Sequence, residues 1–169
     1  MATIIFPGSF QPFHNGHLMV IQGMVKLSDQ VVVVICETPS LTLPSPLDKG
    51  EIEGVVTFSL DQRRDMIGAA LLAVDILDVT IAVVKDAASD DAWAQYVLDA
   101  AGNPSEAMVW SGNDQVRAIF EAKGIATKKI VHVPGIVGEE IRALIQKHDA
   151  AWRTKVPAGA LDVIEDATK

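Results

Sequence analysis

Cysteine and long apolar runs are nearly missing from this sequence of 169 residues. Cys36 is the only cysteine, so a disulfide framework within the chain is excluded and a reducing cytoplasm is the expected location. No run approaches 18 uninterrupted apolar residues, which predicts a chain without a transmembrane helix and without a membrane partner. The N-terminal residues also lack the basic start and the apolar stretch of a secretory signal, which favours the same location.

Positive charge is scarce as well. The chain has 14 lysines and arginines against 22 aspartates and glutamates, giving a net charge of −8. A protein that binds nucleic acid broadly needs basic side chains to neutralise backbone phosphates, so this class is disfavoured. A small nucleotide remains compatible, because a local cluster of donors and one metal ion can hold it. The length fits a single domain over residues 1–169.

Several signatures of nucleotide enzymes and hydrolases are missing. Gly8 and Gly16 are too far apart for the dinucleotide fingerprint G-x-G-x-x-G, and no Gly-Lys-Ser/Thr phosphate cradle occurs. A hydride-transfer enzyme and a P-loop ATPase are therefore disfavoured. His14 and His17 have no neighbouring Cys or His partner for a metal cage, and no Ser–His–Asp arrangement suggests itself.

Strand and helix patterns alternate along the chain. Residues 31–35 form an apolar, β-branched run, which is typical of a strand buried on both faces of a parallel sheet. The pattern predicts an α/β fold with a doubly wound, mostly parallel, five-stranded, Rossmann-like sheet and a C-terminal helix. We expect strands at 2–6, 31–35, 76–84, 107–110 and 128–133, and helices at 16–27, 60–74, 89–101, 114–123, 139–147 and 157–167. For residues 37–58 we expect a long mobile loop, which is either a lid over a ligand or a disordered surface segment.

Residues 4–18 are the most informative stretch. An apolar strand runs into a tight turn, and His14 and His17 follow where a helix should begin. Residues i and i+3 share one face of a helix, and a helix N-terminus offers unpaired N–H groups to anions. Gly16 lies between the histidines and has no Cβ to block a close approach. This arrangement predicts a phosphate site at the carboxyl end of the first strand.

The motif at 8–17 resembles the signature of the nucleotidyltransferase superfamily with the His-x-Gly-His motif. Further segments, in the same order along the chain, resemble the archaeal-type nicotinamide mononucleotide adenylyltransferases. These segments are 58–67, Asp86 with Trp93 seven residues later, 110–113, 138–142, and 152–157. The resemblance covers nearly the whole chain. It implies a cytoplasmic enzyme of NAD biosynthesis that transfers AMP from ATP, with Mg²⁺ on the phosphates, to nicotinamide mononucleotide. The products are NAD and pyrophosphate, and a homo-oligomer is left open.

The resemblance also implies roles for individual residues. The catalytic residues are His14, His17 and Arg142. ATP and its phosphates are bound by Gly8, Ser9, Phe10, Gly16, Gly112, Asn113 and Gly138. The acceptor is bound by Arg63, Asp86 and Trp93, and no side chain binds the metal. For several of these residues a purely structural role stays open at this stage. Trp93 is then a core residue, Arg63 a solvated helix arginine, Asn113 a helix cap, the stretch after the first strand a plain turn, and Arg142 a surface charge.

Three positions depart from the archaeal-type pattern. Ser9 stands where that branch has arginine, Val137 replaces a serine and Glu139 replaces a threonine. A carboxylate near a triphosphate repels it unless a metal ion bridges the two or the side chain turns away. The altered residues Val137 and Glu139 favour one alternative, a catalytically impaired nucleotide-binding regulatory protein. Two others remain: a sister enzyme acting on phosphopantetheine or a cytidylyl acceptor, and a purely structural domain, which the first motif disfavours. His132 and His148 are interpreted as structural or surface residues.

Overall fold

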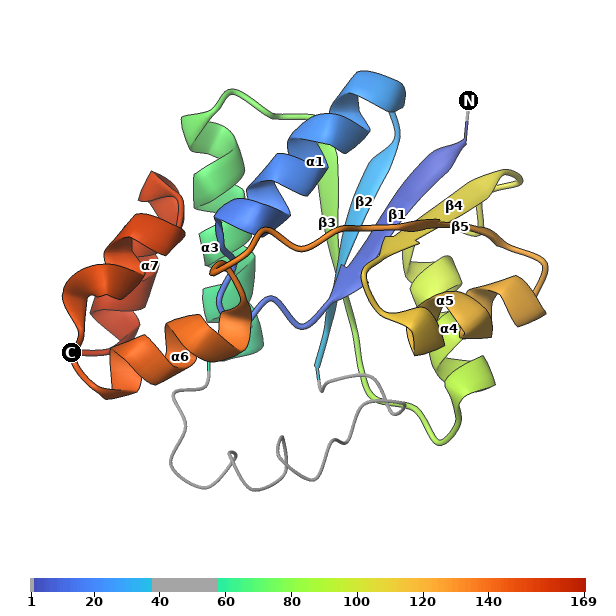
Figure 1. Cartoon of the computed structure of the whole chain (residues 1–169). Helices are drawn as coiled ribbons and strands as arrows, with labels where there is room; N and C mark the ends of the chain where they lie inside the picture. Colours follow the sequence, from blue (N-terminus) through green and yellow to red (C-terminus); the bar gives the residue numbers. More distant parts are fainter. Residues whose placement is uncertain (1, 38–57) are drawn as a thin grey trace. The chain divides into compact units, whose positions relative to one another are not determined.

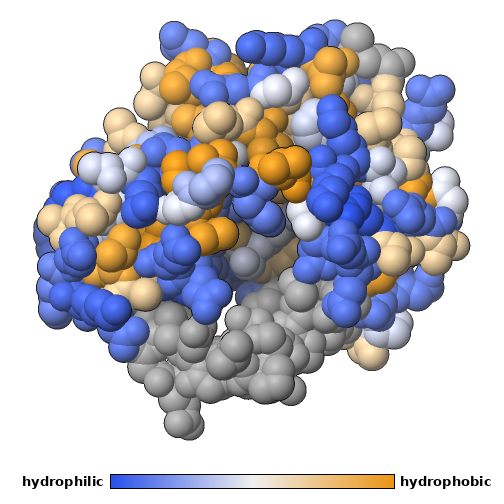
Figure 2. Space-filling model, in the orientation of Figure 1, coloured by the Kyte–Doolittle hydropathy of each residue, from blue (hydrophilic) through white to orange (hydrophobic). Residues whose placement is uncertain are grey.

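The computed structural model describes residues 2–37 and 58–169, and these group into two units. The sheet unit contains the described residues of 2–9, 22–37 and 78–131. The helical unit contains 10–21, 58–77 and 132–169. The loop predicted at about 37–58 lies, apart from its two end residues, outside the described residues. Within them, no helix is long and apolar enough to cross a membrane, and Figure 2 shows polar and apolar residues interspersed on the viewed face.

The sheet unit is built on five parallel strands in the order β3-β2-β1-β4-β5. They are β1 (Thr3–Gly8), β2 (Val31–Cys36), β3 (Val79–Val84), β4 (Ala107–Ser111) and β5 (Ala126–Lys129). All six residues of β2 are buried, as the apolar run predicts. The predicted fold class, a doubly wound parallel sheet of five strands, is confirmed.

The strand order reverses at β1, which pairs with β2 on one side and β4 on the other. In open parallel sheets, ligands bind beyond the carboxyl ends of the strands at such a reversal. The register pairs Ile5 with Val109, and the two strands end shortly afterwards, at Gly8 and Ser111. The turns that follow β1 and β4 therefore leave the sheet side by side.

One face of the sheet is covered by α4 (Asp90–Ala100) and α5 (Asp114–Ala122), as Figure 1 shows. Alternate residues of β2 point to this face, and Trp93 of α4 and Phe120 of α5 pack into the same core. Ser89 caps α4, because its side chain accepts a hydrogen bond from the Ala92 N–H at 3.1 Å.

The last strand differs from its prediction at 128–133. β5 begins at Ala126, which pairs with Met108, and ends at Lys129. The apolar pair at 130–131 suggested a later strand, yet Val131 is 82% exposed. An edge strand with one partner needs less apolar side chain than a central one, so polar residues can form it.

The helical unit contains α3 (Leu60–Ala73), α6 (Gly138–Gln146), a 3₁₀ helix η1 (Ala150–Lys155) and α7 (Ala158–Ala167). The first turn of α1 (Asn15–Leu27) also lies in it. The helices α3 and α7 lie side by side (Figure 1), and a Cβ on Gly159 would stand 2.4 Å from the carbonyl of Ala69. Glycine is required there because the two backbones approach too closely for any side chain.

Candidate active site

The histidines predicted to bind phosphate close the first turn of α1. His14 precedes the helix, and its N–H donates to Nδ1 of His17 at 3.1 Å. The N–H of His17 donates in return to Nδ1 of His14 at 3.3 Å. This is the reciprocal pattern of a capping box, in which the residue before the helix and the third helical residue each accept the other's backbone N–H. The two imidazoles therefore replace the usual serine and glutamate.

This pattern decides which ring nitrogens carry protons. Nδ1 of each ring accepts a hydrogen bond and is therefore unprotonated, so in the neutral imidazole the proton is on Nε2. The two rings are stacked, with centroids 3.6 Å apart and planes 15° apart. The start of α1 thus presents two adjacent Nε2–H donors, while two of its own backbone amides are satisfied by the rings.

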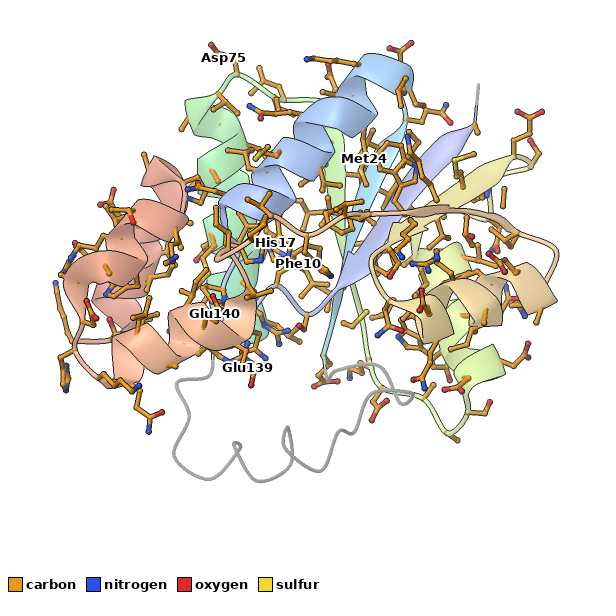
Figure 3. The ribbon with its side chains drawn as sticks, viewed as in Figure 1. Phe10, His17, Met24, Asp75, Glu139 and Glu140 are labelled. Carbon is orange, nitrogen blue, oxygen red and sulfur yellow. The ribbon has the colours of Figure 1, made fainter. Side chains whose placement is uncertain are left out.

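Burial keeps both rings neutral. It lowers the pKa of His14 to about 4, and the positive charge of His132 adds to the effect. Burial also holds the pKa of His17 well below its usual value, with further contributions from the charges of His14 and His132. His17 is flanked by Phe13, stacked at 5.4 Å, and by the edge of Phe10 at 4.8 Å, as Figure 3 shows for Phe10. At neutral pH the pair donates hydrogen bonds without fixed charge.

The His14 ring occupies space that a Cβ at residue 16 would fill. A Cβ at this position would stand 2.9 Å from Cε1 and 3.1 Å from Nδ1 of His14. Real side chains essentially never make such contacts, so any other residue would displace the ring. The glycine is explained by the His14 ring beside it, and its predicted role in a close approach of phosphate stays a prediction.

The start of α6 packs against the same loop. The guanidinium of Arg142 donates from Nη1 to the backbone carbonyl of Gln11 at 2.6 Å. A Cβ on Gly138 would stand 3.1 Å from that carbonyl oxygen and 3.3 Å from Nη1 of Arg142. Arg142 is therefore a partly buried group anchored beside the histidine loop, with further guanidinium N–H groups that can serve a ligand.

Arg63 lies on α3 in the same unit. Its side chain is buried, and Nε donates to the carbonyl of Ser59 at 3.3 Å. It is not the solvated helix arginine that the sequence left open. A buried guanidinium keeps its charge, because arginine does not deprotonate in proteins.

The sheet unit contributes the residues at the carboxyl ends of β1 and β4. Gly8 ends β1 and Ser9 follows it, and Gly112 and Asn113 follow β4. Asn113 caps α5, since its Oδ1 accepts the N–H of Val116 at 3.0 Å. The helix-cap alternative is thus what the structure shows at this position, and the predicted contact with adenine and ribose remains a prediction.

Asp86 and Trp93, the predicted acceptor residues, lie in different surroundings. Asp86 is exposed and accepts the N–H of Ala87 at 2.9 Å. Trp93 is only 3% exposed and packs edge-on against Phe120 at 5.6 Å, so the ring belongs to the core. Its Nε1 has no hydrogen-bond partner among the described residues. Stacking on a nicotinamide stays a prediction and requires this ring to become accessible.

The structure brings together Phe10, His14, Gly16, His17, Gly138 and Arg142 in the helical unit, and Gly8, Ser9, Gly112 and Asn113 in the sheet unit. Among residues 2–37 and 58–169, no cluster of three His, Cys, Asp or Glu could hold a metal ion. Both groups are rich in backbone and side-chain donors, which suits a phosphorylated ligand.

Comparison with known proteins agrees with this chemistry. A model of the cytidylyltransferase-like family matches residues 5–153. The nicotinamide-nucleotide adenylyltransferase of Ignicoccus hospitalis is 30% identical over 168 residues, which cover 96% of this chain and 90% of that relative. The chain belongs to the nicotinamide-nucleotide adenylyltransferase family. As a member of this adenylyltransferase family, it is a nucleotidyltransferase enzyme.

Solved structures share the fold of this adenylyltransferase family member. A bifunctional NMN adenylyltransferase/ADP-ribose pyrophosphatase from Francisella tularensis, complexed with AMP and manganese, superposes with a TM-score of 0.62 at 24% identity. The match covers 86% of this chain and 42% of the bifunctional one, so the chain spans less than half of that protein. The Plasmodium falciparum nicotinic acid mononucleotide adenylyltransferase complexed with NaAD gives 0.64 at 13% identity, covering 98% and 96%.

One residue of this adenylyltransferase family member that acts electrostatically on the histidine pair is not among the predicted site residues. His132 affects the pKa of both His14 and His17. Its position, more than a hundred residues further along the chain, offers no spacing that connects it to the motif. Local sequence patterns do not encode an electrostatic effect between residues so far apart along the chain.

Proposed function

We propose that this chain transfers the adenylyl group of ATP to nicotinamide mononucleotide, forming NAD and pyrophosphate. One observation carries the proposal: the stacked, neutral imidazoles of His14 and His17 present two adjacent Nε2–H donors at the start of α1. Pairs of fixed, uncharged donors suit a phosphorus centre whose charge grows during reaction. Membership of the adenylyltransferase family supports the substrates.

The reaction depends on the positioning of its two substrates more than on a general base. A phosphate oxygen of the mononucleotide is already ionised, and it attacks the α-phosphorus of ATP in line with the leaving oxygen. A new phosphorus–oxygen bond forms as the bond between the α-phosphorus and the bridging oxygen breaks. Pyrophosphate then carries the negative charge away. Hydrogen bonds from His14 and His17 stabilise the charge on the phosphate oxygens along this path.

The remaining donors are assigned by the same proposal. The free N–H groups of the Arg142 fork bind the β- and γ-phosphates, while its Nη1 stays on Gln11. The turns at Gly8 to Phe10 and at Gly138 supply backbone N–H groups, and Gly112 with Asn113 holds the adenosine. Arg63, Asp86 and Trp93 bind the mononucleotide acceptor.

The metal enters with the substrate in this proposal. ATP arrives as its Mg²⁺ complex, and the ion leaves with pyrophosphate. The Francisella tularensis neighbour, which was crystallised with AMP and a manganese ion, supports a divalent cation in this chemistry. Assembly as a homo-oligomer and a cytoplasmic location belong to the same proposal, as does the absence of nucleic-acid partners.

A second candidate is a nucleotide-binding protein without turnover. It is favoured by the start of α6, where Val137 provides no side-chain cap and Glu139 and Glu140 occupy the first turn. Two carboxylates beside a triphosphate weaken its binding unless other groups compensate.

The test is purified protein incubated with Mg·ATP and nicotinamide mononucleotide, with NAD followed through a coupled dehydrogenase. We expect NAD and pyrophosphate in equal amounts. In parallel reactions another acceptor replaces the mononucleotide. Phosphopantetheine is tested with Mg·ATP, and a cytidylyl acceptor is tested with CTP instead of ATP. Pyrophosphate release only with one of these would replace the proposed acceptor. Calorimetric ATP binding without any release would favour the regulatory candidate.

A further inference from the structure

Gln11 lies in the loop before the paired imidazoles and binds two other segments of the helical unit. Its backbone carbonyl accepts Nη1 of Arg142 at 2.6 Å, which links the loop to α6. Its side-chain Oε1 accepts the backbone N–H of Phe58 at 3.0 Å, which links the loop to the approach of α3. One residue therefore joins two helices of the unit to the loop that carries the histidines.

Two different glutamines hold the two amides that precede α3. Phe58 is buried, so its N–H needs a partner within the protein, and Gln11 supplies it across 47 positions of the chain. The N–H of Ser59 donates to Oε1 of Gln62 at 2.9 Å, inside the capping box of the helix itself. Gln62 thus fixes the helix start locally, whereas Gln11 fixes it relative to the histidine loop.

Arg63 is anchored on this helix start. The carbonyl of Ser59 accepts the backbone N–H of Arg63 at 3.0 Å and its side-chain Nε at 3.3 Å. Because Ser59 directly follows Phe58, a shift of the Phe58 amide moves the carbonyl that holds the guanidinium. Arg63 is itself buried among closely packed neighbours, so it follows that carbonyl with little freedom. Two hydrogen bonds and two adjacent residues connect the Gln11 side chain to this guanidinium.

We propose that Gln11 is a positioning residue, which fixes the guanidinium of Arg63 relative to the paired imidazoles so that the acceptor's phosphate meets ATP in line. The proposal rests on the proposed function, which assigns Arg63 to the mononucleotide and Arg142 to the phosphates of ATP. Gln11 is not among the residues to which the family resemblance gives a role. In-line attack is sensitive to displacements of about 1 Å, so a link between the two substrate arginines bears directly on the reaction.

The two contacts of Gln11 differ in what a substitution does to them. The contact with Arg142 uses the backbone carbonyl and survives any change of side chain. The contact with Phe58 uses the side-chain oxygen and is lost when that oxygen is removed. A side-chain variant therefore disturbs the acceptor side of the site and leaves the ATP side in place.

The experiment uses Gln11→Met, which keeps the length of the side chain but has a methyl group in place of the acceptor oxygen. We expect KM for nicotinamide mononucleotide to rise about tenfold, the scale of one hydrogen bond to a charged group, and KM for ATP to change less than about twofold. Steady-state kinetics with each substrate varied in turn give the two constants. Calorimetry with the mononucleotide alone and with Mg·pyrophosphate alone makes the same comparison without turnover.

Gln62→Met is the matched control. It makes the same exchange at the same helix start and removes the acceptor of the Ser59 N–H, but it keeps the bond between Gln11 and Phe58. We expect both variants to melt at a lower temperature and only Gln11→Met to have a raised KM for the mononucleotide. Equal rises in the two variants, or a KM for ATP that rises as much as that for the mononucleotide, would overturn the proposal.

A double-mutant cycle tests whether Gln11 acts through Arg63. In an Arg63→Met background the further change Gln11→Met should leave KM for the mononucleotide unchanged, because the guanidinium that it displaces is already gone. Additive effects of the two changes would mean that Gln11 acts by another route. If Gln11→Met fails to fold, Gln11→Glu takes its place: its carboxylate still accepts the Phe58 N–H, so the ratio of the two KM values should stay near that of the unmodified chain, and a changed ratio would contradict the proposal.

The two proposals fail separately. If the unmodified chain binds the mononucleotide without making NAD, and Gln11→Met weakens that binding but not the binding of Mg·pyrophosphate, the reaction is wrong and the positioning role is right. If NAD forms and Gln11→Met changes neither KM, the reaction is right and Gln11 has no part in it. An unmodified chain that neither binds nor converts the mononucleotide would overturn both.

Discussion

The helices α1 and α6 begin in the same unit but treat their N-terminal amides differently. At α1, the side chains of His14 and His17 accept each other's backbone N–H. At α6, Val137 gives no side-chain cap, and Glu139 and Glu140 follow in the first turn, as Figure 3 shows. One helix start is closed by the rings that we propose bind the ligand. The other leaves its amides available but adds two negative charges beside them.

If both helix starts bind phosphate, as we propose, the difference illustrates two ways to build an anion site at a helix N-terminus. Open amides attract an anion through the helix dipole, but acidic side chains in the first turn compete for the same positive potential. Side-chain donors such as the imidazoles at α1 add their own hydrogen bonds and are fixed by the cap. At α6 the compensation comes from Arg142, whose guanidinium reaches back to Gln11. We therefore expect phosphate recognition to depend on α1 more than on α6.

The largest expected effect comes from removing one ring at α1. His17→Ala loses both the Nε2–H donor and the Nδ1 acceptor that caps the helix. The lost donor should reduce kcat roughly 10²- to 10³-fold, by analogy with a single oxyanion-hole donor. The lost cap should cost about 1 kcal/mol of unfolding free energy, or roughly 2–4 °C in melting temperature. Steady-state kinetics and thermal unfolding measure the two losses.

His17→Gln separates them. Glutamine is favoured at the third helical position of a capping box, so it can accept the N–H of His14 while lacking the ring. We expect this variant to lose as much activity as His17→Ala but to keep a melting temperature close to that of the unmodified chain. If the activity of His17→Gln followed its stability and stayed high, the imidazole would be a cap and nothing more.

The second expected effect concerns stability against pH. His14 has a pKa of about 4 in the folded chain and about 6.5 when unfolded. The unfolded state therefore binds its proton first, so stability is complete above pH 6.5 and falls as the pH drops towards 4. By pH 5 this one group should have removed about 2 kcal/mol, and His17 adds to the loss in the same direction.

His14→Asn isolates this contribution, because asparagine is a good residue before a helix and keeps the cap without titrating. Urea unfolding at pH 7.5, 6 and 5 should show a shallower loss of unfolding free energy in the variant, while carboxylates titrate alike in both proteins. Parallel pH profiles for the two proteins would mean that His14 is not held neutral in the folded state.

The same two helix starts show how much of the fold and of the candidate site can be predicted from the sequence. The buried run of β2 and the i, i+3 spacing of His14 and His17 predicted the sheet and the phosphate motif, because both signals are local. The exchange of hydrogen bonds between the rings could not be predicted, since it depends on side-chain rotamers. Arg142 was placed by resemblance, but its bond to Gln11 joins residues 131 positions apart.

Other residues show the limits of local patterns. Trp93 has the spacing of a ligand-binding residue and the burial of a core residue, and spacing alone cannot give burial. The 3₁₀ helix η1 was not predicted, because its single capping residue, Asp149, also suits an ordinary turn. His132 was interpreted as a surface residue. The interpretation is correct about its exposure, but its electrostatic effect on His14 joins residues far apart in the sequence, which no local pattern encodes.

The smallest expected effect tests the other side of the comparison, at α6. Glu139→Gln removes one negative charge from the helix start at nearly constant size. If a triphosphate lies near this end, KM for ATP should fall about two- to fivefold, since exposed charges contribute only about 0.3–1 kcal/mol. The same change removes a favourable interaction with the helix dipole, so the chain should become slightly less stable.

Glu140→Gln loses the same dipole interaction from the neighbouring position and is the matched control. A lower KM in Glu139→Gln alone would place that carboxylate against the phosphates; an equal fall in both would indicate a general effect of net charge. No change in either would mean that α6 contributes through Arg142 and not through its amides, which would widen the difference between the two helix starts.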